Sequence, residues 1–128
     1  MADHDIQRIV ESLENLEGLA PAGDLRVDEV RAADIAEALG DMDDDARVLI
    51  ISLLSDEKAA EVLTLCDERT IEALTERLST DRLIRLLDDM DPDDAADVIE
   101  LASEELQPEL VGGLDEDHRR SVRSLQEH

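Results

Sequence analysis

The chain of 128 residues has no Trp, Tyr or Phe, one Cys and one Lys. Without aromatic side chains, any core must be built from Leu, Ile, Val, Ala and Met. The single cysteine, Cys66, excludes a disulfide scaffold and a zinc site made of cysteines. The longest unbroken apolar run, residues 48–51, is far shorter than the ~20 residues that cross a bilayer. The N-terminus has no basic stretch followed by an apolar one, so we expect no signal peptide.

Positive charge is also scarce. Lys and Arg number 12 and Asp and Glu number 36, which gives a formal net charge of −24. Phosphate repels such a protein, so we expect no nucleic-acid partner and instead favour cations or basic partners. Eleven of the 12 basic residues are Arg, and Asp outnumbers Glu twenty to sixteen, as is typical of a salt-adapted or high-GC source. Part of the acidic surface can therefore be explained by solubility in brine. Cation binding is not needed to explain that part.

What the sequence does contain is an ungapped repeat of 24 residues. Three apolar positions recur in every unit: Leu39, Leu63, Leu87 and Val111; Met42, Cys66, Met90 and Leu114; Ile50, Leu74, Val98 and Val122. Polar positions recur as well: Asp43, Asp67, Asp91 and Asp115; Ser55, Ser79 and Ser103. A fixed period of this length is typical of a solenoid-like array.

Each unit is predicted to form two short helices. In the second unit, Ser55 and Asp67 are predicted helix N-caps. Apolar residues follow each cap at spacings of three and four, which is one helical face; they are Ala59, Val62, Leu63 and Cys66, then Ile71, Leu74 and Leu78. No segment alternates with a period of two. We therefore expect an all-α array without a sheet, whose short helices must pack on neighbouring units to be stable.

The ends of the chain are less regular. Residues 1–22 are predicted to hold an amphipathic helix (residues 6–19) and a linker, and the repeat domain is predicted to span residues 23–128. A short helical turn is expected at residues 25–30. In the fourth unit, Gln107 and Pro108 are expected either to interrupt the unit or to restart it, and Gly112 and Gly113 to end its first helix.

The sequence shows no enzymatic constellation. There is no Gly-rich phosphate loop, and the three histidines, His4, His118 and His128, are scattered. Cys66 stands in a column of Met and Leu, which favours a small core residue over a nucleophile. We therefore predict that the chain is not an enzyme.

The carboxylates are better candidates for a functional site, above all those in residues 88–100. Five of them have EF-hand spacing, namely Asp89, Asp91, Asp93, Asp97 and Glu100, but Asp94 stands where that loop needs Gly. The repeat predicts a helix there, with Asp93 and Asp97 on one face. Like charges four residues apart repel unless a cation lies between them, and Mg²⁺ prefers such oxygen ligands. A solvated acidic face explains the same pattern equally well.

Five segments resemble a known family. Residues 57–63 (EKAAEVL) and 91–97 (DPDDAAD) are similar to the N-terminal cytosolic domain of MgtE-type magnesium transporters. Residues 23–26, 33–37 and 114–117 fit the same pattern in the same order, so the resemblance covers roughly residues 23–127. The Asp-rich segment is the more specific; the remainder also suits other helical-repeat adaptors.

The resemblance implies a right-handed superhelix of short helices that regulates a membrane pore from the cytosolic side. In such transporters the domain precedes tandem CBS domains and the pore, within a homodimer. Mg²⁺ bridges its acidic face to CBS-domain carboxylates and stabilises the closed state. Carried over by motif, the metal ligands would be Glu61, Asp93 and Asp97.

Two questions stay open at this point. The sequence ends before any CBS-like or pore segment, so we expect either an excised domain or a stand-alone relative, with only a weak, partial Mg²⁺ site and a link to the membrane only through a pore domain. The alternative function is a metal-independent helical scaffold that binds a protein on its concave face.

Overall fold

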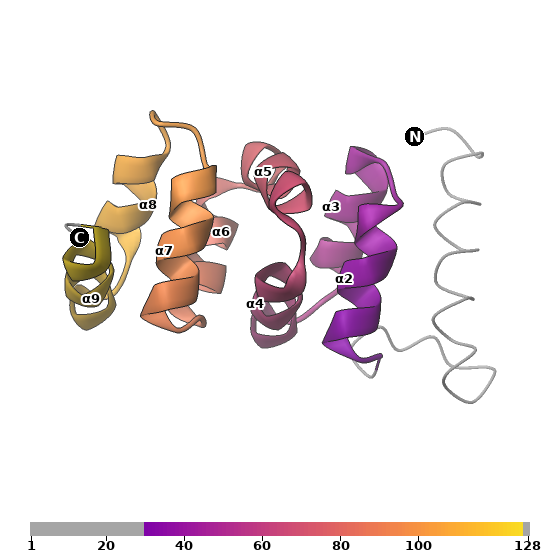
Figure 1. Cartoon of the computed structure of the whole chain (residues 1–128), viewed down its shortest axis with the longest axis horizontal. Helices are drawn as coiled ribbons and strands as arrows, with labels where there is room; N and C mark the ends of the chain where they lie inside the picture. Colours follow the sequence, from indigo (N-terminus) through magenta and orange to yellow (C-terminus); the bar gives the residue numbers. More distant parts are fainter. Residues whose placement is uncertain (1–29, 127–128) are drawn as a thin grey trace.

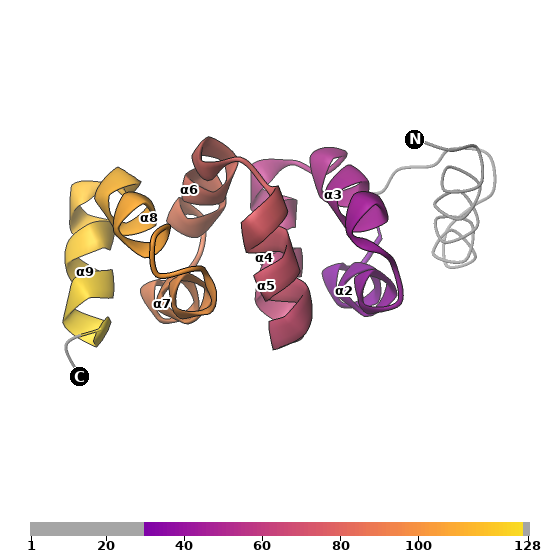
Figure 2. The ribbon, with the colours of Figure 1, turned by 90° about the horizontal axis from the view of Figure 1, so that it is seen from above.

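The structure is a computed structural model that describes residues 30–126. This part of the chain forms eight α-helices and no strand, as the repeat predicts. The helices are α2 (Ala32–Gly40), α3 (Asp44–Ser52), α4 (Asp56–Leu65), α5 (Glu68–Arg77), α6 (Thr80–Asp88), α7 (Pro92–Leu101), α8 (Gln107–Gly113) and α9 (Glu116–Gln126). They follow one another along the long axis, from α2 and α3 at one end to α8 and α9 at the other (Figures 1 and 2).

The helix boundaries repeat the period of the sequence. The second helix of each unit begins at residues 44, 68, 92 and 116, and the first helix of the first three units begins at residues 32, 56 and 80. Only α8 departs from the period, because it begins at residue 107 rather than at 104. A proline ring clashes with the carbonyl four residues earlier in a helix, so Pro108 is accepted only in the first turn. The predicted restart at Gln107 and Pro108 is confirmed.

The predicted caps Ser55 and Asp67 form hydrogen bonds, as do most residues at the equivalent Asp and Ser positions of the repeat. Five side chains accept one from the backbone N–H three residues later: Asp43 (2.9 Å), Ser55 (3.2 Å), Asp67 (2.7 Å), Ser79 (3.2 Å) and Ser103 (3.3 Å). Asp91 stands at the same position of the third unit, but its side chain forms no capping hydrogen bond. The next residue, Pro92, begins α7 with its φ angle already suited to a helix.

Helices in equivalent positions pack on one another. Among the first helices of the units, α2 packs on α4, α4 on α6, and α6 on α8. Among the second helices, α3 packs on α5, α5 on α7, and α7 on α9. All three apolar columns of the repeat are buried in one continuous core, from Val30 to Val122. Each helix buries one face in this way, which leaves the carboxylates on the opposite faces.

Two arginines donate hydrogen bonds to carbonyls at the end of another helix. Arg47 of α3 donates from Nε to the carbonyl of Leu39 at the end of α2 (2.8 Å) and pairs with Asp44 (3.0 Å). Arg82 of α6 donates to the carbonyl of Leu54 after α3 (2.9 Å). These contacts give terminal carbonyls a partner that the helix itself does not supply.

Some predictions concern residues that the structure does not describe. The helix at residues 6–19, the boundary between residues 22 and 23, and all but the last residue of the turn at 25–30 belong to this group, and they stay predictions. Among residues 30–126, no helix is long and apolar enough to cross a membrane.

Candidate metal site

The three predicted metal ligands lie on the exposed faces of α4 and α7. On α4 the neighbouring Ala60 and Val62 are buried, so Glu61 faces solvent. On α7 the buried face is formed by Ala95, Ala96, Val98 and Ile99. Asp93 and Asp97 are therefore exposed, and their spacing of four residues places them on one side of α7.

Glu61 lines a groove of about 340 Å³ between α4 and the start of α7. Leu65 and Met90 provide apolar surface in this groove, and Asp94 faces it from α7. The remaining lining residues are Glu57, Ala60, Thr64, Asp89 and Asp91. The α4–α7 groove, as we name it, therefore combines an apolar floor with five carboxylates.

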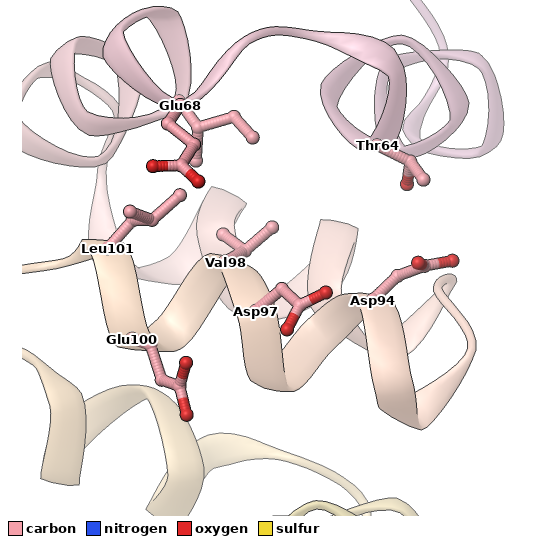
Figure 3. Close-up of a pocket in the computed structure, with 8 residues that line it drawn as sticks. Thr64, Glu68, Asp94, Asp97, Val98, Glu100 and Leu101 are labelled. Atoms are coloured by element: carbon pink, nitrogen blue, oxygen red, sulfur yellow. The ribbon is translucent and has the colours of Figure 1, made fainter.

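A second groove of about 310 Å³ continues along α7 toward α5. Asp94, Asp97 and Glu100 follow one another along α7, with Thr64 of α4 and Glu68 of α5 across from them (Figure 3). Val98 and Leu101 lie between these carboxylates and α5. Thr64 and Asp94 line both grooves, so the two form one acidic surface.

The structure thus distributes the predicted ligands over adjoining positions. Glu61 lines the first groove, Asp97 lines the second, and Asp93 lines neither. Asp94, which sequence analysis did not select, lines both. One residue along a helix is a rotation of about 100°, so Asp94 lies nearer the core side of α7 than Asp93 and is half-buried. Asp94 lies seven residues, or about two helical turns, before the half-buried Leu101. This spacing is the sequence signal that could have identified Asp94.

This surface has little positive charge of its own. Among residues 30–126, no Arg or Lys forms an ion pair with Glu61, Asp94 or Asp97. Some carboxylates elsewhere are paired, such as Asp44 with Arg47 and Arg77, and Asp56 with Arg82 and Arg85. Like charges three or four residues apart on α7 repel, and a cation would relieve that repulsion.

The oxygen atoms of this surface suit a hard divalent cation, but they do not form a complete set of ligands. Carboxylate oxygens are the ligands that Mg²⁺ prefers, usually together with several waters. Within the described part of the chain, however, no three His, Cys, Asp or Glu side chains gather closely enough to hold a metal ion. The acidic surface therefore supplies one or two ligands at a time. The EF-hand interpretation remains rejected, since residues 92–101 are helical.

Two other reactive side chains of the described residues, Cys66 and His118, lie outside this surface. Cys66 is buried at the end of α4, and burial raises the pKa of its thiol to about 12, with the neighbouring Asp67 adding to the effect. A thiol with this pKa is neutral near pH 7 and is a poor nucleophile. His118 lies on α9, at the far end of the array.

The comparison with family models decides the identity of the domain. The model described as the MgtE intracellular N domain matches residues 30–128. The chain belongs to the MgtE intracellular N domain family. No curated protein matches the chain. The resemblance of the two motifs to this family is therefore confirmed, and so is the expected intracellular placement of the family's domain.

Two solved structures share the fold of this MgtE N domain. One is the cytosolic domain of the Mg²⁺ channel MgtE in complex with ATP, with a TM-score of 0.74 and 24% identity over 92% of this chain and 50% of that one. The other is the soluble part of a magnesium transporter, with a TM-score of 0.71 and 13% identity over 96% of this chain and 48% of that one. The chain spans about half the length of these proteins. That the chain is not an enzyme stays a prediction.

Proposed function

We propose that this MgtE N domain senses Mg²⁺ for a magnesium transporter. Its acidic surface on α4 and α7 binds Mg²⁺ together with carboxylates of a partner module, the CBS domains of the same transporter, and this contact stabilises the closed pore of the homodimer. Glu61, Asp93 and Asp97 are the proposed ligands, and Asp94 adds negative charge between them. The observation that carries the proposal is a run of carboxylates on α4 and α7 that has no basic partner among residues 30–126.

The physical basis is the repulsion between acidic modules. Two unit charges ~5 Å apart cost about 3 kcal/mol at an effective dielectric constant near 20, and under ~1 kcal/mol in water. A docked acidic partner lowers the effective dielectric constant around Glu61 and Asp97, so docking is unfavourable without a cation. A shared Mg²⁺ would supply the divalent charge that offsets this repulsion. When the concentration of Mg²⁺ falls, the carboxylates repel the partner and the domain moves away.

The incomplete ligand set supports a Mg²⁺ site whose ligands are shared between this domain and a partner module. Since this domain offers one or two carboxylates at a time, the isolated domain should bind Mg²⁺ weakly, and the partner module should provide the other ligands. The affinity then depends on whether the two modules are docked, which is the property that a sensor needs.

Thermal unfolding tests the proposal on the chain as it is. A ligand at about ten times its Kd stabilises a protein by ~1.4 kcal/mol, which is about 5 °C for a domain of this size. Millimolar MgCl₂ should therefore raise Tm above its value in NaCl of equal ionic strength. Asp93→Asn combined with Asp97→Asn should remove the excess.

The control variant removes the same charge elsewhere. Glu104→Gln with Glu105→Gln neutralises two exposed carboxylates in the loop between α7 and α8, outside both grooves, and it should keep the excess shift. Equal Tm values in the two salts would leave only charge screening. In that case the alternative function, a metal-independent scaffold that binds a protein partner, would account for the fold.

A further inference from the structure

The last helix carries a basic surface on an otherwise acidic molecule. Arg119, Arg120 and Arg123 of α9, with Glu116 and Ser124, line a groove of about 430 Å³. Three arginines against one glutamate make this groove positive, although the whole chain carries −24. We name this set of residues the α9 surface.

The charge of the α9 surface is available for a partner. Elsewhere Arg47, Arg77, Arg82 and Arg85 are engaged by acidic neighbours or helix carbonyls. On α9, Arg119 donates to the carbonyl of Gly112 (3.3 Å). On α9, the pair between Arg120 and Glu116 (3.3 Å) has both side chains 74% exposed, where such a pair contributes little. Arg123 is exposed and forms no ion pair or hydrogen bond with any residue between 30 and 126.

The position of α9 leaves this side uncovered within the array. Val122 is its one buried residue and lies on the core side, which packs on α7 and α8. Arg120 and Arg123 lie on the other side of α9 and are exposed among the described residues.

We propose that the α9 surface docks an acidic helical segment of a protein partner. Guanidinium groups form paired hydrogen bonds with carboxylates, and Arg120 and Arg123 are close enough along α9 to meet two acidic side chains on a facing helix. No metal takes part, so the α9 surface is independent of the Mg²⁺-binding surface on α4 and α7.

A short acidic segment suits this surface better than an extended polyanion. At physiological salt the charges are screened beyond ~8 Å, so a segment confined to α9 interacts mainly with the arginines. A nucleic acid or an anionic membrane would extend over the acidic helices and be repelled by them.

The test measures fluorescence anisotropy of a labelled helical peptide rich in Glu, in EDTA. A second peptide carries Gln in place of Glu. The chain should bind the Glu peptide and not the Gln peptide, more weakly as NaCl rises. Arg120→Glu with Arg123→Glu should weaken binding about tenfold or more. Arg120→Gln with Arg123→Gln, which creates no new repulsion with Glu116, should lower the affinity less.

The control variant matches the change in charge. Lys58→Glu with Arg69→Glu alters the net charge equally on α4 and α5 and should leave peptide binding within about twofold. Equal weakening by this control, or no binding of the Glu peptide, would overturn the proposal. Binding to vesicles of phosphatidylserine rather than to the peptide would overturn it as well, by assigning the α9 surface to lipid. None of these outcomes depends on Mg²⁺, so they leave the sensing proposal untouched.

Discussion

At the scale of single residues, Cys66 shows how the repeat sets chemistry. It occupies the column of Met42, Met90 and Leu114 at the end of the first helix of its unit, and all four side chains are buried. Burial and the nearby Asp67 raise the pKa of the thiol to about 12. The structural position alone therefore makes this cysteine an inert core residue.

The raised pKa predicts a loss of stability at high pH. In the unfolded chain the thiol ionises near pH 8.5. Since the folded pKa is higher, the free energy of unfolding should fall between about pH 9 and pH 12, by at most ~1.4 kcal/mol per pH unit. Urea unfolding across this range measures the slope, and the absence of tyrosine leaves few other groups to titrate. Cys66→Ala should flatten it; an equal slope in both proteins would contradict the assignment.

Arg47 is a second residue whose role follows from its contacts. Its side chain is 12% exposed, and its guanidinium binds the carbonyls of Leu39 (2.8 Å) and Gly40 (3.4 Å) as well as Asp44. Arg47→Met keeps most of the aliphatic contact but leaves the carbonyls without this donor. We expect the free energy of unfolding to drop by about 1.5–3 kcal/mol in urea. Arg69→Met, at an exposed site, should change it by less than about 0.5 kcal/mol.

At the scale of helices, equivalent caps differ in strength. The N–H of Thr70 donates to Asp67 at 2.7 Å, and this bond lowers the pKa of the Asp67 carboxyl. Asp91 has the same place in the next unit and forms no such bond. The stabilisation by Asp67 is therefore present above its ordinary pKa, near pH 4, and is lost as the pH falls through the lowered value.

The two caps form a matched pair for mutation. Asp67→Ala should lower Tm by about 4 °C near pH 7, since a cap that accepts a backbone hydrogen bond is lost. Asp91→Ala should lower Tm by less than half as much. Thermal unfolding followed by circular dichroism measures both, and Asp67→Asn is expected to retain most of the stability because Asn also caps. A larger effect at Asp91 would contradict the cap assignment.

The helices were predictable because the periodicity is local. The columns of Leu39, Met42 and Ile50 recur every 24 residues, and the second helices begin at that interval without exception. Pro108 likewise identified the late start of α8. The roles of Arg47 and Arg82 were not predictable, since each depends on which helix end the fold brings beside it. Sequence spacing holds no information on that choice.

At the scale of the whole molecule, the acidic surface shows where sequence stops being sufficient. The motif selected Glu61, Asp93 and Asp97, and the structure places Glu61 and Asp97 in adjoining grooves but Asp93 in neither. The spacing of Asp93 and Asp97 defines a shared face of α7. Which neighbouring helix that face approaches depends on how α7 packs against α5 and α9, and this is a property of the array.

Two surfaces of opposite charge give the array two distinct ways to bind partners. The α4–α7 groove is acidic and, as proposed, needs Mg²⁺ to approach another acidic module. The α9 surface is basic and, as proposed, binds an acidic segment directly. Since they lie on different units of one continuous core, each can be altered without changing the other.

A magnesium titration followed by ¹H–¹⁵N NMR tests the central claim most directly, because it detects weak binding residue by residue. Amide signals around Glu61, Asp94 and Asp97 should shift and approach saturation as MgCl₂ is added, while NaCl of equal ionic strength leaves them nearly unchanged. Small shifts spread evenly over the acidic helices, or the largest shifts away from α4 and α7, would contradict the account.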